Sequence, residues 1–132
     1  MILVDTSVLI DYFAGRATSA VSYLDRLLEA ADPFYVTPSV VQELLQGAAD
    51  EREWRKLRSY LTSLMFVDVR DPMESHLAAA RIYFDCRRRG LTVRSSADCL
   101  IAQVALERKL ALLHSDRDFD AIAKVRPLHT LP

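Results

Sequence analysis

Short apolar segments alternate along this chain with longer segments of helical periodicity, and no other feature restricts the fold as much. Five segments have the apolar, β-branched character of strands. These are residues 2–4, 34–37, 65–69, 111–114 and 128–131, the last as an edge strand. Because strands that alternate with helices favour parallel pairing, we expect an α/β fold with a central parallel sheet flanked by helices.

The helical segments have apolar residues three or four positions apart and end at recognisable stop signals. We predict helices at residues 7–13, 19–30, 53–64, 74–89, 97–108 and 119–124, and one capped by Ser39 that runs to Gly47. In the helix over 53–64, a stripe of Trp54, Leu57, Leu61 and Leu64 favours core packing, and a partner surface is the alternative.

Length and charge narrow the class of protein. The chain has 132 residues, 51% of them hydrophobic, so we expect one domain that spans residues 1–132. Seventeen basic and eighteen acidic side chains give a net charge of −1. This balance excludes nucleic-acid binding through bulk positive charge, although a local basic patch is still compatible with it.

Two cysteines, Cys86 and Cys99, form no CxxC pair and no disulfide framework, so reduced thiols are expected. The N-terminus lacks the basic region of a signal peptide, and its apolar run is broken at Asp5. No apolar segment approaches the ~20 residues that span a bilayer. We therefore expect a cytoplasmic protein with no membrane contact.

Two acids follow predicted strands directly. Asp5 ends the first strand, and Asp116 follows the fourth. Parallel sheets place their sites at the carboxyl ends of strands, so these acids would share a crevice if the two strands are neighbours. The alternative is that each aspartate caps the next helix. For Asp116, capping and a place in the site are equally good explanations. For Asp5, capping is the weaker explanation, because Thr6 and Ser7 can already serve as caps.

Two further acids lie on predicted helices. Asp98 points in the same direction as Ile101, Ala102 and Ala105, in the middle of an apolar face, where an ionised carboxylate is costly without a partner. A favourable interaction with the helix dipole would explain its place in the first turn but not its inward direction. Glu43 lies at the margin of an apolar face, on a helix that follows the second strand.

If these four acids converge, their charges require neutralisation. Two carboxylates ~4 Å apart repel by ~4 kcal/mol at an effective dielectric constant near 20. Either some carboxylates are protonated, or a hard cation binds them. Oxygen ligands without suitably spaced histidine or cysteine favour Mg²⁺ or Mn²⁺ over zinc. Such a site supports metal-assisted cleavage of phosphodiester bonds by an activated water.

Four segments, in order, resemble a known family: "ILVDTSVLID", "SVVQELLQG", "SSADCLIAQVAL" and "LLHSDRDFDAI". Together they resemble PIN domains, and in particular the VapC-type toxins of toxin–antitoxin pairs, over essentially the whole chain. The resemblance implies a Rossmann-like sheet with adjacent first and fourth strands. It also implies an endoribonuclease that depends on Mg²⁺ or Mn²⁺, often acting on structured RNA such as transfer or ribosomal RNA.

The resemblance also assigns residues and partners. Its catalytic and metal-binding acids correspond to Asp5, Glu43, Asp98 and Asp116, with Ser7 and Asp118 in supporting roles. It implies a homodimer and a VapB-type antitoxin that blocks the site. His114 stands where many members have threonine, which makes the hydrogen bonding around Asp116 uncertain.

Three arginine features are candidates for RNA contact. Arg16 and Arg94 lie close in sequence to site acids and could hold phosphates. The run of arginines at 87–89 is better explained as a helix end before Gly90, where cations complement the helix dipole.

Two other functions compete with the nuclease. A phosphotransfer domain with an aspartyl nucleophile commonly has a second acid two residues after the first and a lysine after a late strand. This chain has Ser7 at the first of these positions, and the segment "HSDRD" after the fourth strand contains no lysine. A catalytically inactive PIN-like module that only binds RNA or a partner would have lost one or more acids, and all four are present.

Overall fold

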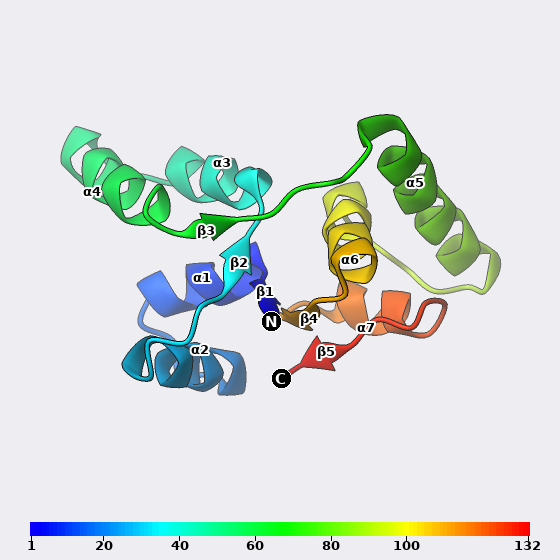
Figure 1. Cartoon of the computed structure of the whole chain (residues 1–132), viewed down its shortest axis with the longest axis horizontal. Coiled ribbons are helices and arrows are strands. Elements are labelled where there is room, and N and C mark those ends of the chain that lie inside the picture. Colours follow the sequence, from blue (N-terminus) through cyan, green and yellow to red (C-terminus); the bar gives the residue numbers. More distant parts are fainter.

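Five strands form one parallel sheet in the order β3-β2-β1-β4-β5, at the centre of the computed structural model of residues 1–132 (Figure 1). The strands are β1 (Ile2–Val4), β2 (Tyr35–Val36), β3 (Met65–Phe66), β4 (Ala111–Leu113) and β5 (Thr130–Leu131). The predicted parallel sheet and its C-terminal edge strand are confirmed, although β3 is shorter than the predicted 65–69.

Seven helices connect and cover the strands. They are α1 (Thr6–Phe13), α2 (Ser19–Glu29), α3 (Pro38–Gln46), α4 (Glu51–Leu61), α5 (Pro72–Arg88), α6 (Ser96–Arg108) and α7 (Arg117–Ala123). None of them combines the length and the apolar character needed to cross a membrane.

Helices α3, α4, α5 and α7 each begin two residues before their predicted starts, and α1 and α6 begin one residue earlier. Thr37, not Ser39, is the N-cap of α3, because Pro38 with its fixed φ takes the first helical position. The Thr37 and Ser39 hydroxyls hydrogen-bond each other at 2.8 Å instead. Helix α4 begins two residues before the predicted 53, because the Asp50 side chain accepts a hydrogen bond from the Glu53 amide at 2.8 Å.

Alternating side chains of the central strands supply two separate cores. Leu3 and Leu112 belong to the core beneath α5, α6 and α7, whereas Val4 and Leu113 belong to the core beneath α1, α2, α3 and α4. All four side chains are completely buried. Because successive residues of a strand face opposite sides, β1 and β4 read as continuous apolar runs, as expected for a sheet covered on both faces.

The strand order creates a switch point between β1 and β4. From β1 the chain builds outward through β2 and β3, and it then returns to the other side of β1 to place β4 and β5 (Figure 1). Strands β1 and β4 pair in register, with Val4 beside Leu113, so the residues after both strands emerge together. Open parallel sheets bind their ligands at such points.

The apolar stripe of α4 is only partly buried. Leu61 is completely buried, Leu57 is half-buried, and Trp54 is 39% exposed. The helix ends at Leu61 and not at the predicted residue 64, so half-buried Leu64 lies beyond it. The stripe therefore enters the core at one end of the helix, and Trp54 lies at the surface at the other end.

Candidate functional site

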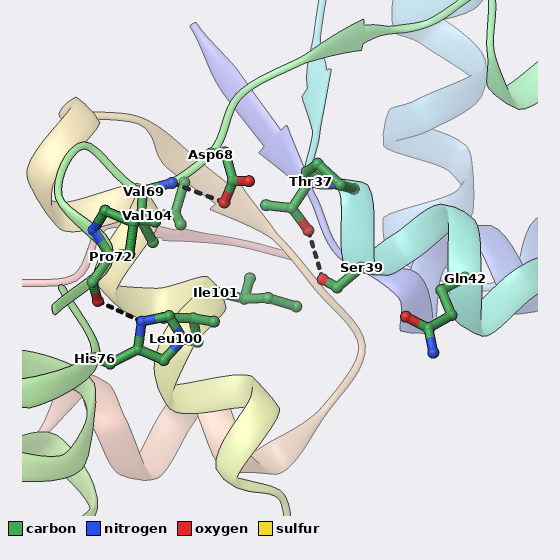
Figure 2. A pocket seen from close by; sticks show the side chains of 11 residues that line it. Thr37, Ser39, Gln42, Asp68, Val69, Pro72, His76, Leu100, Ile101 and Val104 are labelled. Atoms are coloured by element: carbon green, nitrogen blue, oxygen red, sulfur yellow. Dashed lines mark hydrogen bonds between the residues drawn. The ribbon is translucent and has the colours of Figure 1, made fainter.

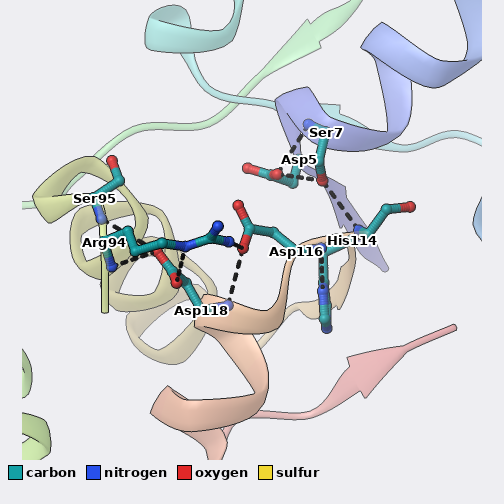
Figure 3. A network of polar contacts seen from close by, with 8 residues as sticks. Asp5, Ser7, Arg94, Ser95, His114, Asp116 and Asp118 are labelled. Carbon is teal, nitrogen blue, oxygen red and sulfur yellow. Dashed lines mark hydrogen bonds and ion pairs between the residues drawn. The ribbon is translucent and has the colours of Figure 1, made fainter. Parts of the chain in front are cut away.

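Asp5 follows β1 and begins α1. Its Oδ2 atom accepts hydrogen bonds from the Ser7 amide at 3.0 Å and from the Ser7 hydroxyl at 2.6 Å (Figure 3). Asp5 is therefore the N-cap of α1, and the expectation that Thr6 or Ser7 would take this role is wrong. Burial raises the pKa of Asp5 and outweighs these hydrogen bonds, which act to lower it.

The segment after β4 is tied to the start of α1. The Ser115 amide donates to the Ser7 hydroxyl at 3.0 Å. Ser7 thus links the ends of the two central strands, a positioning role that accounts for a hydroxyl at this place. Asp116 then caps α7 by accepting a hydrogen bond from the Asp118 amide at 2.9 Å. Capping and convergence on the crevice are compatible for both Asp5 and Asp116.

His114 follows β4 and precedes Asp116 by two residues. Its Nδ1 atom accepts a hydrogen bond from the Asp116 amide at 3.2 Å (Figure 3). The ring is buried and packs against Phe119, with 5.0 Å between the ring centroids. The amide of Asp116 therefore keeps a side-chain partner, and this bond requires an unprotonated Nδ1.

Asp98 lies in the first turn of α6 and points inward, as its helical position predicted. Only 9% of the residue is exposed, and its Oδ2 atom is buried without a hydrogen-bond partner. Burial, the hydrogen bond to Asp118 and the charges of Asp5 and Asp116 raise the pKa of Asp98 to about 8. Without a cation, Asp98 therefore carries a proton at neutral pH.

Asp118 is held by the chain segment that precedes α6. Its Oδ2 atom accepts hydrogen bonds from the amides of Arg94 at 2.9 Å and Ser95 at 3.1 Å. Burial acts to raise the pKa of Asp118, but hydrogen bonds from Asp98, Ser95 and Arg94 outweigh it and the pKa is lowered. Asp118 is thus the charged member of the pair that it forms with Asp98.

Three carboxylates form the tightest acidic group. Oxygen atoms of Asp98, Asp116 and Asp118 all lie within 4.8 Å of one another. The sequence prediction had put Asp118 outside the ligand set, but its position is as suitable as that of Asp98 or Asp116. Asp5 lies outside this group, yet it is close enough for its charge to raise the pKa of Asp98.

Glu43 is the most exposed of the four predicted acids. Partial desolvation and the charge of Asp5 raise the pKa of Glu43, so its carboxylate faces the same crevice from α3. The sequence prediction missed Thr6 as a residue of this crevice. The Thr6 hydroxyl is buried without a partner within hydrogen-bond distance, on the side of α1 that approaches Glu43. The position of Thr6 directly after Asp5 was the only sequence feature that could have indicated its place in the crevice.

The arginines considered for RNA contact lie in different parts of the structure, and they differ in whether they reach the acids. Arg94 reaches the site and forms ion pairs with Asp116 and Asp118. Arg16 instead pairs with Asp11 at 2.8 Å. The arginine run at 87–89 closes α5, where Gly90 adopts a φ of +71°, as expected for a helix end.

The donor set suits a hard divalent cation. The three clustered side chains offer only carboxylate oxygens, the ligands that Mg²⁺ and Mn²⁺ prefer. The buried Asp98 Oδ2 atom is a polar atom that such a cation would satisfy. The pKa of Asp98 is raised first by burial and then by its hydrogen bond to Asp118 and the neighbouring negative charges, and a bound cation would favour the ionised carboxylate against all three.

A cleft of about 410 Å³ lies between α3 and α6 (Figure 2). Leu100, Ile101 and Val104 of α6 form an apolar wall, opposite Ser39 and Gln42 of α3. The same two helices carry Asp98 and Glu43, although none of the site acids lines the cleft. No lysine or arginine lines it.

The sequence of this chain is similar to those of known proteins. A family profile for the PIN domain matches residues 2–125. The chain is 38% identical over 129 residues to a protein named Ribonuclease VapC11 from Mycobacterium tuberculosis, with 97% of this chain and 96% of the relative covered. The same values hold for VapC ribonuclease Mb1587 from Mycobacterium bovis.

Solved structures share the fold. The structure of VapBC-1 from nontypeable Haemophilus influenzae matches with a TM-score of 0.73 and 20% identity, covering 99% of this chain and 97% of that one. VapBC2 from Rickettsia felis, bound to a promoter DNA fragment, matches with a TM-score of 0.71 and 17% identity, covering 99% and 98%.

Proposed function

This chain belongs to the PIN domain family, in its VapC branch, and we propose that it is a metal-dependent endoribonuclease that acts as the toxin of a type II toxin–antitoxin pair. The relatives that cover its whole length are named ribonucleases. The observation that carries the proposal is the convergence of Asp98, Asp116 and Asp118, with Asp5 beside them, at the switch point of the sheet.

We assign the acids distinct duties in cleavage. Asp98, Asp116 and Asp118 would hold the cation, with Asp5 and Glu43 on the adjacent side of the crevice. A bound Mg²⁺ or Mn²⁺ supplies charge neutralisation at the phosphate and acidifies a water molecule. Glu43, exposed and with a raised pKa, is the acid best placed to accept a proton from the attacking water.

The other residues position these acids. Ser7 fixes Asp5 and the segment after β4, and His114 fixes the Asp116 amide. Hydrolysis by this route should leave 5′-phosphate and 3′-hydroxyl ends. A metal-independent ribonuclease that uses the RNA 2′-hydroxyl would leave cyclic phosphates instead.

We propose a single-stranded or splayed nucleotide of a structured RNA, such as transfer or ribosomal RNA, as the substrate. The cleft between α3 and α6 combines an apolar wall with the Gln42 amide, a combination that suits an unstacked base. Because Asp68 lines it and no lysine or arginine does, the cleft is a poor site for a phosphate. Phosphates would lie toward Arg94.

We also propose a VapB-type antitoxin and a second copy of this chain as partners. One structural relative is titled a toxin–antitoxin complex from Klebsiella pneumoniae, and another, VapBC-5 from Mycobacterium tuberculosis, is titled a member of the VapBC family of toxin–antitoxin systems. Exposed large apolar side chains, including Phe13 and Trp54, support a surface that a partner covers.

The decisive experiment measures cleavage of total RNA by purified protein with and without Mg²⁺ or Mn²⁺. We expect cleavage that chelator abolishes and that Asp5→Asn and Asp98→Asn each reduce at least ~100-fold. Asp25→Asn is the matched control, since Asp25 is an exposed acid of α2. Cleavage retained in excess chelator would reject the metal-dependent mechanism. Intact RNA binding without any cleavage would favour the inactive module.

A further inference from the structure

Arg94 lies between two carboxylates of the candidate metal site. Its Nη2 atom is 3.2 Å from Asp116 Oδ1, and its Nε atom is 3.4 Å from Asp118 Oδ1 (Figure 3). Both acids belong to the group whose oxygens lie within 4.8 Å of one another. One guanidinium therefore faces two of the three carboxylates that a cation would use.

The same carboxylates have few free oxygens to share. Asp116 Oδ1 already accepts the Asp118 amide in addition to Arg94, and Asp118 Oδ2 accepts two backbone amides. Asp118 Oδ1, the remaining oxygen of that side chain, is the one that Arg94 contacts. A cation that takes this oxygen must therefore compete with the guanidinium.

The backbone and the side chain of Arg94 are held in different ways. The Arg94 and Ser95 amides bind buried Asp118 and anchor this segment before α6. The guanidinium side chain, in contrast, is 62% exposed and makes two ion pairs at relatively long distances. Ion pairs of an exposed guanidinium at these distances are weak even though Asp118 is buried, so the side chain can leave while the segment stays in place.

We propose that Arg94 is a built-in counter-ion, which balances the charge of Asp116 and Asp118 until a divalent cation displaces its guanidinium toward the RNA. The inference rests on the proposed metal-dependent function. Displacement leaves a planar group with paired donors at the mouth of the site, a geometry that matches a phosphate. Arg94 would thus neutralise the acids first and then hold the substrate.

The first test measures Mn²⁺ binding by isothermal titration calorimetry, without RNA. We compare the unchanged protein with Arg94→Gln, Arg94→Lys and the control Arg55→Gln. Arg55 forms an exposed ion pair with Glu51 on α4, so its loss changes net charge equally elsewhere. We expect Arg94→Gln to bind Mn²⁺ about fivefold more tightly, the size of an exposed ion pair, and Arg55→Gln to match the unchanged protein.

The second test separates displacement from simple charge repulsion. The Nε–H signal of Arg94, identified by its loss in Arg94→Gln, is followed by NMR during titration with diamagnetic Mg²⁺. We expect a signal of restricted mobility without Mg²⁺ and of a mobile side chain at saturation. A signal that stays restricted at saturating Mg²⁺ would overturn the inference.

The outcomes distinguish the two proposals. If Arg94→Gln binds Mn²⁺ with the same affinity as the protein without substitutions, and that protein shows metal-dependent cleavage, then the counter-ion role of Arg94 is rejected and the proposed function is not. Absence of Mn²⁺ binding and of cleavage in every variant rejects the metal-dependent function and this inference together. Tighter Mn²⁺ binding with slower RNA cleavage in Arg94→Gln supports both roles of the side chain, and Arg94→Lys should fall between.

Discussion

At the scale of single residues, the site acids have both structural and chemical duties. Asp5 and Asp116 cap α1 and α7, and the capping bonds leave other carboxylate oxygens facing the crevice. Asp118 is the buried anchor of the segment before α6 as well as a neighbour of Asp98. Because a capping aspartate has a fixed orientation, the same hydrogen bonds that stabilise the helices also preorganise the carboxylates.

The protonation of Asp98 predicts how stability depends on pH in the absence of metal. An unfolded Asp98 has a pKa near 3.8, whereas in the folded chain the pKa is about 8. Between these values the folded state binds more protons than the unfolded state, so the free energy of unfolding falls as pH rises. Asp98→Asn removes the titrating carboxyl group and with it this dependence on pH. The free energy of unfolding of Asp98→Asn, relative to that of the unchanged protein, should therefore increase from pH 5 to pH 8.

Urea denaturation in chelator measures this difference. The expected gain is of the order of 1 kcal/mol per pH unit at most, since each pKa unit corresponds to about that energy. Asp25→Asn should show no such trend. A difference between Asp98→Asn and the unchanged protein that stays constant from pH 5 to pH 8 would show that Asp98 ionises normally.

Asp118 should matter for stability far more than its neighbour Asp120 on the same helix. Asp118→Ala removes the acceptor for the Arg94 and Ser95 amides. We expect a loss of about 1–3 kcal/mol in the free energy of unfolding, measured by denaturation at pH 6, where Asp98 is still protonated. Asp120 is 66% exposed, and Asp120→Ala should change stability by less than ~0.5 kcal/mol. Equal effects would mean that the anchoring bonds contribute nothing.

At the scale of elements, periodicity located the helices and strands, while local chemistry set their ends. Helix α3 starts at Pro38 with Thr37 as its N-cap, and Asp50 sets the start of α4. Strand β3 has two residues, Met65 and Phe66, which pair with the two residues of β2. An amphipathic stripe also shows which face is apolar but not how far it is covered, as α4 demonstrates.

Helix α4 therefore offers a matched pair of truncations. Leu61 is completely buried, so Leu61→Ala should lower the free energy of unfolding by about 2–4 kcal/mol through a lost contact and a cavity. Trp54 is 39% exposed, and Trp54→Ala should cost about 1 kcal/mol or less. Thermal and urea denaturation give both values. A larger cost for Trp54 would mean that the surface end of the stripe is packed in solution, as a homodimer would require.

At the scale of the whole molecule, the switch point gathers acids from four distant segments at one edge of the sheet. This concentration of negative charge opposes folding, and a cation that binds only the folded chain should reverse the effect. At 100 times its dissociation constant, such a cation adds about 2.7 kcal/mol to the free energy of unfolding.

Mn²⁺ should therefore raise the Tm of the unchanged protein by several degrees, measured by scanning calorimetry. Asp116→Asn removes one of the three clustered carboxylates, and its Tm should respond much less. Asp25→Asn, which leaves the cluster intact, should keep the full response. If Mn²⁺ raised the Tm of Asp116→Asn as much as that of the unchanged protein, the cation would be binding elsewhere.

The sequence by itself determined the order of the elements, the parallel sheet and the inward direction of Asp98, because apolar periodicity and strand–helix alternation are local properties. It also indicated the PIN resemblance through four segments in order. The resemblance also implied that β1 and β4 are neighbours, which the sheet order confirms. Tertiary structure alone decided that Asp118 joins Asp98 and Asp116 and that Arg94 lies between two acids. These are distances between residues remote in the chain, and they depend on how the sheet is ordered and on which amides a buried carboxylate can reach.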